Sequence, residues 1–305
     1  MKIAIFGTGG VGGYYGARLA AAGEEVHFIA RGAHLEAIRE GGLRVASALG
    51  DVHLQPAHAT DDPADIGPVD LVVIAVKLYD TEAAAAACST LLGPDTAVVS
   101  LQNGVTAMDT LAAAIGAERL FGGLTYIMAT ISRPGVIEHL GDMAKIRFGE
   151  VNATRSARVG ALEAACLRAG LDAAISDNIT VDLWTKVSFL APVSGVTSLV
   201  RLPLGPIRAD RDTRALLRAA MDEAVAVAHA KDIGLPDDLA ERHMAMVDGL
   251  PATMGSSMLH DLIHHKRLEL AWLSGTVARM GGEIGVATPT HDTITAALKL
   301  HADGH

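Results

Sequence analysis

The sequence predicts an α/β protein whose N-terminal half alternates strands with helices and whose C-terminal half is entirely helical. The chain opens with a short apolar run, a glycine-rich turn and an alanine-rich helix, which together form one strand–loop–helix unit. Further apolar runs follow, each ending in polar residues before a helical stretch. Beyond these, helical periodicity dominates, so the expected domains are residues 1–175 and 176–305.

Composition limits the kind of protein this can be. The 305 residues suffice for two domains, and half of them are apolar although only 4% are aromatic. Lys and Arg number 25 against 35 Asp and Glu, which gives a net charge of −10. Nucleic-acid-binding proteins usually carry a basic surplus or patch, so we expect no nucleic-acid partner. An anionic small ligand must be held by local groups against this global field.

Two cysteines, Cys88 and Cys166, are too few for a disulfide scaffold or a cysteine-based zinc site. We expect both to be core residues in a reducing compartment. No apolar run approaches the roughly 20 residues that a membrane span requires. The first residues are typical of a strand rather than a signal peptide, so a cytoplasmic protein with no membrane partner is expected.

The first strand, expected over residues 2–6, leads into GTGGVG and a helix that stops near residue 22. Gly7 permits the tight turn, Gly9 lets the backbone approach a pyrophosphate, and Gly12 lets helix and strand pack closely. Another strand over residues 26–30 completes the unit, which is the context of a Rossmann-type dinucleotide fingerprint. The expected cofactor-binding residues of the loop are Gly7, Thr8, Gly9, Gly10, Val11 and Gly12.

The end of the second strand indicates which dinucleotide is bound. NAD enzymes place an acidic residue there for the ribose 2′-hydroxyl, but Glu24 and Glu25 precede this strand. Arg31 lies 19 residues after Gly12, where a guanidinium suits a 2′-phosphate. We therefore expect NADP(H), with an exposed loop arginine as the alternative interpretation of Arg31.

Polar side chains follow the next two expected strands, residues 69–76 and 96–101. Lys77 follows the first and Asn103 the second, and each strand precedes an expected helix. Ligands of open parallel sheets bind beyond the carboxyl ends of strands, so both residues are candidates for cofactor binding. Asn103-Gly104 is also a common turn signal. Residues 121–150 are typical of further, partly antiparallel strands, and 153–169 of a helix.

In the helical half, apolar spacing predicts a helix from Ile179, which Pro192 should end or kink. Lys186 neighbours its apolar stripe. Other helices are expected over residues 211–231 and 256–280, the latter with Glu269 in its middle. By pattern alone, Lys186 and Glu269 read as members of surface ion pairs. His260 and His264 have the spacing of two metal ligands on a helix, but no supporting motif accompanies them, so no metal is expected.

These motifs together resemble the ketopantoate reductase (2-dehydropantoate 2-reductase) family along nearly the whole chain. The resemblance rests on GTGGVG, on IARGAHLEAIREGGLRV with Arg31, on AVKLYDT with Lys77, and on SLQNGV with Asn103. It continues with DNITVDLWTKV, which contains Lys186, and ends with SSMLHDLIHHKRLELAWLSG and GIGVATPT.

The resemblance implies an oxidoreductase that reduces a 2-oxo acid to a 2-hydroxy acid with NADPH. Ketopantoate, reduced to pantoate in pantothenate biosynthesis, is the leading substrate. It implies that Lys186 is the catalytic lysine, that Ser257 binds the substrate carboxylate, and that Glu269 partners substrate or lysine. A lysine ammonium can stabilise the charge that develops on the ketone oxygen and can donate the proton.

The chain departs from the family pattern WxKxxxNxxxNxxTAL, because Leu190 and Ser194 stand where asparagines are usual. These two positions are expected to contact substrate, and Leu190 suits a more apolar 2-oxo acid. One alternative is therefore a D-2-hydroxyacid dehydrogenase of the same family. Another is a non-catalytic NADP(H)-binding regulatory protein, although Lys186 and Glu269 speak against it. Alanine- and leucine-rich helix faces allow either a core or a homodimer interface.

Overall fold

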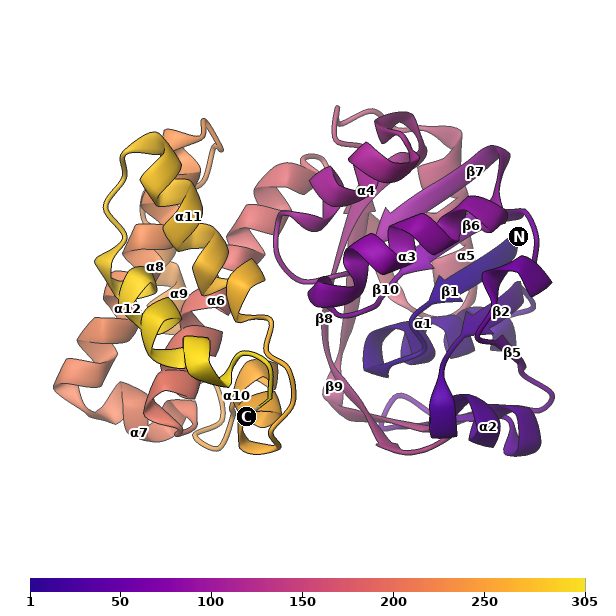
Figure 1. The fold of residues 1–305 in the computed structure, drawn as a ribbon, viewed down its shortest axis with the longest axis horizontal. Coiled ribbons are helices and arrows are strands. Elements are labelled where there is room, and N and C mark those ends of the chain that lie inside the picture. Colours follow the sequence, from indigo (N-terminus) through magenta and orange to yellow (C-terminus); the bar gives the residue numbers. More distant parts are fainter. Residues whose placement is uncertain (305) are drawn as a thin grey trace. The chain divides into compact units, whose positions relative to one another are not determined.

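A computed structural model describes residues 1–304, and their contacts group the chain into two compact units. The first comprises residues 1–102 and 107–179, and the second comprises residues 103–106 together with the chain from Thr180 onward. Figure 1 shows the strands in the first unit and only helices in the second. The predicted α/β fold, with a Rossmann-type part followed by a helical part, is confirmed.

The first unit is built on one ten-stranded sheet in the order β4-β3-β9-β8-β7-β6-β1-β2-β5, with β10 paired to β9. Its parallel centre contains β1 (Lys2–Phe6), β2 (Glu25–Ile29), β6 (Val69–Ile74) and β7 (Leu92–Ser100). β1 lies between β2 and β6, with Ile5 opposite Phe28 on one side and Val73 on the other. The carboxyl ends of these strands therefore share one edge, where a ligand of such a sheet binds.

A long antiparallel hairpin, β8 (Leu120–Arg133) and β9 (Val136–Gly149), extends the sheet as the sequence predicted. The strands β3 (Leu43–Ser47), β4 (Val52–Leu54), β5 (His58–Thr60) and β10 (Asp172–Ile175) were not expected. They have three to five residues each, too few to show a periodicity. Their pairing partners, rather than their own sequences, define them.

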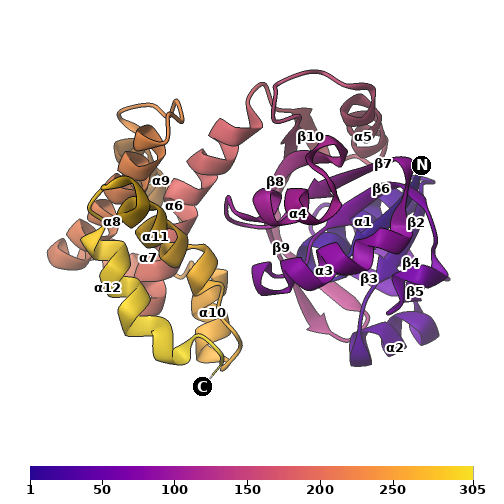
Figure 2. The same ribbon diagram turned by 45° about the horizontal axis from the view of Figure 1, so that its top comes forward.

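Five α-helices belong to this unit: α1 (Gly10–Ala21), α2 (Gly32–Gly41), α3 (Thr81–Ala87), α4 (Ala107–Ile115) and α5 (Ala157–Arg168). A Cβ on Gly10 would lie 2.0 Å from the Ala129 carbonyl oxygen, so α1 packs its first turn directly on the hairpin. α5 lies along β10 (Figure 2) and begins later than expected, because the Ser156 hydroxyl caps it at the Val159 N–H.

Both cysteines are core residues, as predicted. Cys166 lies in the core around α1 and α5, and Cys88 lies in the core on the other side of the central strands. Neither forms a disulfide, and burial raises the pKa of each thiol to about 12. A thiol that stays protonated is a poor nucleophile, so both cysteines serve packing.

The second unit is a cluster of seven α-helices around one apolar core. They are α6 (Ile179–Val200), α7 (Leu204–Ala209), α8 (Arg211–Ala230), α9 (Leu239–Gly249), α10 (Ser257–Ile263), α11 (Ser274–Ile284) and α12 (Pro289–Leu298). The core includes Trp184, Val187, Met221 and Val277, all at least nine-tenths buried. α7, α9 and α12 were not anticipated.

Of the two outcomes expected at Pro192, an end of the helix is wrong, and the single helix expected over residues 256–280 is wrong as well. Pro192 neither ends α6 nor prevents the helix from reaching Val200, because its neighbours Ala191 and Val193 are buried and packing outweighs one lost backbone hydrogen bond. The helix expected over residues 256–280 is two helices instead. α10 stops at Ile263, His265 adopts a φ of +52°, and α11 begins only at Ser274.

The expectation that no segment is long and apolar enough to span a membrane also needs correction. Within residues 1–304, α6 alone has that length and composition, with 22 residues and a mean hydropathy of 1.2 over its most apolar window. However, 61% of that window is buried inside the protein. This burial is typical of the core helix of a globular unit, so one such helix is weak evidence for a membrane span.

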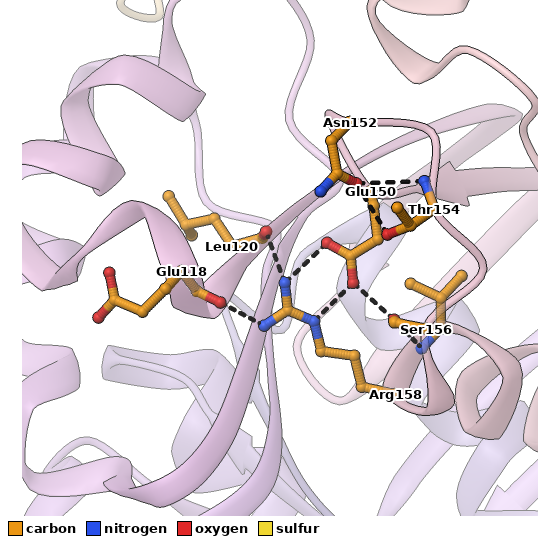
Figure 3. A network of polar contacts seen from close by, with 8 residues as sticks. Glu118, Leu120, Glu150, Asn152, Thr154, Ser156 and Arg158 are labelled. Carbon is orange, nitrogen blue, oxygen red and sulfur yellow. Dashed lines mark hydrogen bonds and ion pairs between the residues drawn. The ribbon is translucent and has the colours of Figure 1, made fainter.

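One polar network joins the hairpin to α5 (Figure 3). The Arg158 guanidinium donates from Nε to Glu150 Oε1 and from Nη2 to Oε2, both at 2.7 Å. It also donates to the backbone carbonyls of Glu118 and Leu120, while the Ser156 hydroxyl donates to Glu150. Burial raises the pKa of Glu150, but the hydrogen bonds from Arg158 and Ser156 outweigh it and leave the pKa below 4.5.

We expect Arg158→Met to lower the free energy of unfolding by about 1–3 kcal/mol, because the buried Glu150 carboxylate and two carbonyls lose their donor. A depressed carboxyl pKa stabilises the fold above the unfolded value of 4.5 and stops doing so as pH falls through the folded value. The difference between wild type and variant should therefore shrink in acid, as measured by urea unfolding at several pH values.

Arg155→Met is the matched control, because the Arg155–Asp177 pair in the same segment is exposed on both sides. It should change the unfolding free energy by less than about 0.5 kcal/mol. Equal effects of the two variants would show that the Arg158 network does not stabilise the unit.

Candidate functional site

The glycine-rich loop between β1 and α1 has the geometry of a dinucleotide cradle. Gly7 has a φ of +101°, which only glycine adopts readily. A Cβ on Gly12 would lie 2.2 Å from the Gly7 carbonyl oxygen, so only glycine allows α1 to approach this closely. A Cβ on Gly9 would meet no atom within 4 Å, so the space above it is open to a ligand.

The start of α1 suits a phosphate. Gly9 is the N-cap residue, provides no side-chain acceptor, and is followed by no acidic residue in the first turn. The backbone N–H groups of that turn can therefore bind an anion. Thr8 can contribute only its backbone, because its buried hydroxyl donates to the Ile29 carbonyl at 2.9 Å. Val11 is half-buried.

Arg31 lies directly after β2, as the N-cap residue of α2. Its side chain is exposed, and within residues 1–304 no carboxylate forms an ion pair with it. The guanidinium is therefore available to an anion beside the carboxyl end of β2. Together with the open space above Gly9 and the uncapped start of α1, this arrangement fits an anionic dinucleotide.

Gln102, which the sequence did not single out, is a buried amide that links the segments following the next two strands. Gln102 donates from Nε2 to the Val76 carbonyl at 3.1 Å and to the Thr81 hydroxyl at 2.8 Å, and it accepts from Ser100. It thereby fixes the segment that carries Lys77, which is half-buried. The available signal was a polar residue directly after a buried strand, next to Asn103.

In the second unit, the loop residue Asn103 meets Lys186 of α6. The Lys186 ammonium donates from Nζ to Asn103 Oδ1 at 2.8 Å. Gly104 has a φ of +87°, so the expected turn at this pair is present as well. Burial lowers the pKa of Lys186 from 10.5 to about 8, while the carboxylate of Glu269 acts to raise it.

Glu269 lies between α10 and α11, not in the middle of a helix as expected. It is only 5% exposed, and its backbone carbonyl accepts from the N–H groups of Trp272 and Leu273. These bonds fix its place at the start of a short 3₁₀ turn, residues 270–272. Lys266, its expected surface partner, is exposed whereas Glu269 is buried.

The three other positions expected to contact substrate, besides Lys186 and Glu269, differ in their surroundings. Leu190, one turn after Lys186, is half-buried and packs against the helical core. Ser194 is fully buried, and its hydroxyl has no hydrogen-bond partner in the described part of the chain. Ser257 is exposed at the start of α10, whose cap is its neighbour Ser256 through a 3.0 Å bond from the Leu259 N–H.

This arrangement can supply a proton near neutral pH. An ammonium with a pKa of about 8 is mostly protonated at pH 7 yet gives up its proton far more readily than an exposed lysine. The imidazoles of His260 and His264 stack at 4.0 Å, but no group of three or more His, Cys, Asp or Glu that could hold a metal ion occurs among the described residues.

Comparison with known proteins identifies relatives over the whole chain. The family model described as ketopantoate reductase PanE/ApbA matches residues 3–153, and the corresponding C-terminal model matches residues 178–302. The chain is 33% identical to the 2-dehydropantoate 2-reductase of Mesorhizobium japonicum, covering 98% of this chain and 97% of that protein.

Solved structures agree. The crystal structure of the 2-dehydropantoate 2-reductase from Geobacter metallireducens matches with a TM-score of 0.92 and 31% identity, covering 98% of this chain and 99% of the other. D-Mandelate dehydrogenase in its ternary structure with NADH and anilino(oxo)acetate matches with a TM-score of 0.91 and 24% identity, covering 99% of this chain and 98% of the other. That last likeness is one of fold.

We expect Glu269→Gln to lower the pKa of Lys186 below about 8, because the carboxylate that raises this pKa is removed while the burial that lowers it remains. Titration of the lysine Cε–H and Nζ signals by NMR measures the change. The control Glu283→Gln removes an exposed carboxylate paired with Arg279 and should leave the Lys186 titration in place. An unchanged titration in Glu269→Gln would disprove the coupling.

Proposed function

The chain belongs to the ketopantoate reductase family, and from this premise we propose that it reduces a 2-oxo acid to a 2-hydroxy acid with NADPH. As a member of this family it is an oxidoreductase that acts on a CH–OH group. We propose ketopantoate as the substrate and pantoate as the product. The observation that carries the proposal is the contact of Lys186 with Asn103, near the buried Glu269.

The dinucleotide, when bound, supplies the hydride. In the proposal, the loop from Gly7 to Gly12 binds the pyrophosphate through its backbone N–H groups. Arg31 binds the 2′-phosphate, because a guanidinium can donate two parallel hydrogen bonds to it. Lys77 and Asn103, which follow neighbouring strands, lie toward the ribose and nicotinamide. NADPH rather than NADH follows from Arg31 and from the absence of an acid at the end of β2.

Lys186 is the proposed proton donor. When the carbonyl carbon accepts a hydride, negative charge develops on its oxygen, and a preorganised ammonium stabilises that charge. The Asn103 amide oxygen accepts a hydrogen bond from this ammonium at 2.8 Å and so fixes its position. The carboxylate of Glu269 raises the pKa of Lys186 and so offsets part of the effect of burial. The ammonium therefore stays mostly protonated at pH 7 and can serve as the proton donor.

A second candidate is a reductase of the same family that acts on a more apolar 2-oxo acid. The observation that favours it is Leu190, which lies one turn after Lys186 and offers a methyl surface where the family pattern has an amide. A non-catalytic NADP(H)-binding role is disfavoured, because a binding protein has no need for a desolvated ammonium. A cytoplasmic location, a homodimer and a domain boundary at 175/176 remain predictions.

We expect NADPH oxidation, followed by absorbance, with at least one member of a panel of 2-oxo acids that includes ketopantoate and branched and aromatic apolar acids. A kcat/KM highest for ketopantoate supports the first candidate, and one highest for an apolar acid supports the second. Tight NADPH binding without turnover of any acid would leave only the binding protein.

Lys186→Ala should reduce kcat by about 10²–10⁴-fold, because the general acid and its charge are both removed. NADPH affinity, measured separately by calorimetry, should change little. Lys299→Ala, at an exposed position near the C-terminus, is the control and should behave as wild type. Unchanged turnover in Lys186→Ala would remove this residue from the catalytic role.

We expect Arg31→Ala to weaken NADPH binding by about 10- to 100-fold, the loss typical of a hydrogen bond to a charged group, and to leave NADH binding nearly unchanged. Arg39→Ala removes an exposed guanidinium at the other end of the same helix and serves as the control. Equal losses for NADPH and NADH in Arg31→Ala would show that Arg31 does not bind the 2′-phosphate.

A further inference from the structure

One buried imidazole in the second unit has no part in the site described so far. His243 lies within α9 and is only 3% exposed. It interrupts a buried apolar stripe of this helix that is otherwise formed by Leu239, Ala240, Met244 and Val247. A buried polar ring costs free energy unless its polar atoms are hydrogen-bonded. The partners of His243 therefore indicate its role.

These partners belong to one turn of α6. His243 Nε2 lies 2.9 Å from the Ser188 hydroxyl oxygen, and the ring also forms a hydrogen bond with the Thr185 backbone. The Ser188 hydroxyl donates its own hydrogen to the Thr185 carbonyl at 3.0 Å, so it accepts from the ring, and Nε2 carries a hydrogen. Burial lowers the pKa of His243 to about 4, against the opposite effect of the Thr185 backbone, so the ring is a neutral donor at pH 7.

The same ring also packs against α6. Phe189 meets His243 edge to face, with the ring centroids 5.4 Å apart. The contacts of His243 thus involve Thr185, Ser188 and Phe189, which stand one residue before and two and three residues after Lys186. α9 thereby holds the turn of α6 that carries Lys186.

This turn of α6 lacks part of the usual backbone bonding of a helix. Pro192 has no N–H, so the Ser188 carbonyl, four residues earlier, loses its helical donor. The hydrogen bonds of the Ser188 hydroxyl and of His243 act on the same turn but come from side chains. They restrain α6 where its own series of hydrogen bonds is interrupted.

We infer that His243 is a positioning residue for Lys186: from α9 it fixes the backbone turn that carries the lysine, while Asn103 fixes the ammonium at the far end of the side chain. The inference rests on the proposed function, in which this ammonium meets the carbonyl oxygen of the substrate. A displacement of about 1 Å in a reacting group can cost about 10²-fold in rate. A turn that is free to shift would move the ammonium by such an amount.

Three variants test this role. His243→Leu keeps an apolar side chain in the core but removes the hydrogen bonds to α6. His243→Gln restores an N–H near the Nε2 position, and Ser188→Ala removes only the accepting hydroxyl. His229→Leu is the matched control, because the half-buried His229 ring bonds the Leu235 carbonyl at 3.0 Å, in the same unit but away from α6.

The readouts are kinetics with the 2-oxo acid that wild type reduces fastest, and NMR titration of Lys186. His243→Leu should lower kcat by about 10- to 100-fold while NADPH affinity, measured by calorimetry, stays within about two-fold of wild type. The pKa of Lys186 should rise above about 8, because a less restrained ammonium regains hydration. His243→Gln should recover most of kcat, Ser188→Ala should lose less than His243→Leu, and His229→Leu should match wild type in both readouts.

A double-mutant cycle separates positioning from a merely structural role. If His243 acts through Lys186, adding His243→Leu to Lys186→Ala should reduce the residual activity little further. The same fold-loss in both backgrounds would overturn the inference. So would wild-type kcat in a His243→Leu protein whose thermal unfolding shows that it is folded. Should His243→Leu not fold, wild-type kcat in Ser188→Ala would overturn it instead.

Failure of the proposed function gives a different result. If wild type reduces no 2-oxo acid, the proposed function is wrong, and the inference falls with it. If wild type does reduce one, while His243→Leu retains both its kcat and its Lys186 titration, the proposed function stands and the positioning role of His243 alone is rejected.

Discussion

The 2.8 Å hydrogen bond between Lys186 and Asn103 is the contact on which the candidate site depends. Both residues belong to the second unit, Asn103 in a loop and Lys186 on α6. An ammonium in partly buried surroundings is costly unless its donors are satisfied, so both partners must be placed accurately. α6 places Lys186 because its other faces are buried in the helical core, and Gly104 turns the chain so that Asn103 can reach it.

Burial has opposite consequences for different polar groups in this protein. It makes Lys186 a better acid by lowering its pKa to about 8, and it makes Cys88 and Cys166 inert by raising theirs. In each case the charged form is disfavoured, but for an amine that form is the protonated one and for a thiol the deprotonated one. The same physical effect therefore keeps the two thiols protonated and makes the ammonium a stronger acid.

A site residue could be predicted from the sequence where its role depends only on neighbouring residues in the chain. Gly7 and Gly12 are demanded by a turn and by a backbone approach within one strand–loop–helix unit, so their spacing alone predicts the cradle. Lys186 and Glu269 could not be predicted from pattern alone, since their partners lie far away in the chain or across a loop. Glu269 shows this most clearly, because a continuous helix seemed to contain it, yet α10 ends at Ile263 and the carboxylate is buried beyond it. Pro192 failed as a helix stop for a related reason, since packing of α6 outweighs a local rule.

Positions 190 and 194 on α6 determine which polar groups this helix can offer to the part of a substrate beyond its carbonyl group. An amide at the Leu190 position would offer a donor and an acceptor to a substrate hydroxyl, whereas a leucine offers neither. Ser194 retains a hydroxyl, but it is fully buried and without a partner in the described chain, so α6 contributes no exposed polar group at either position. Reduction needs only the carbonyl and the carboxylate of the acid. The role proposed for Lys186 is therefore independent of the rest of the substrate, whereas the role proposed for Leu190 is in selecting it.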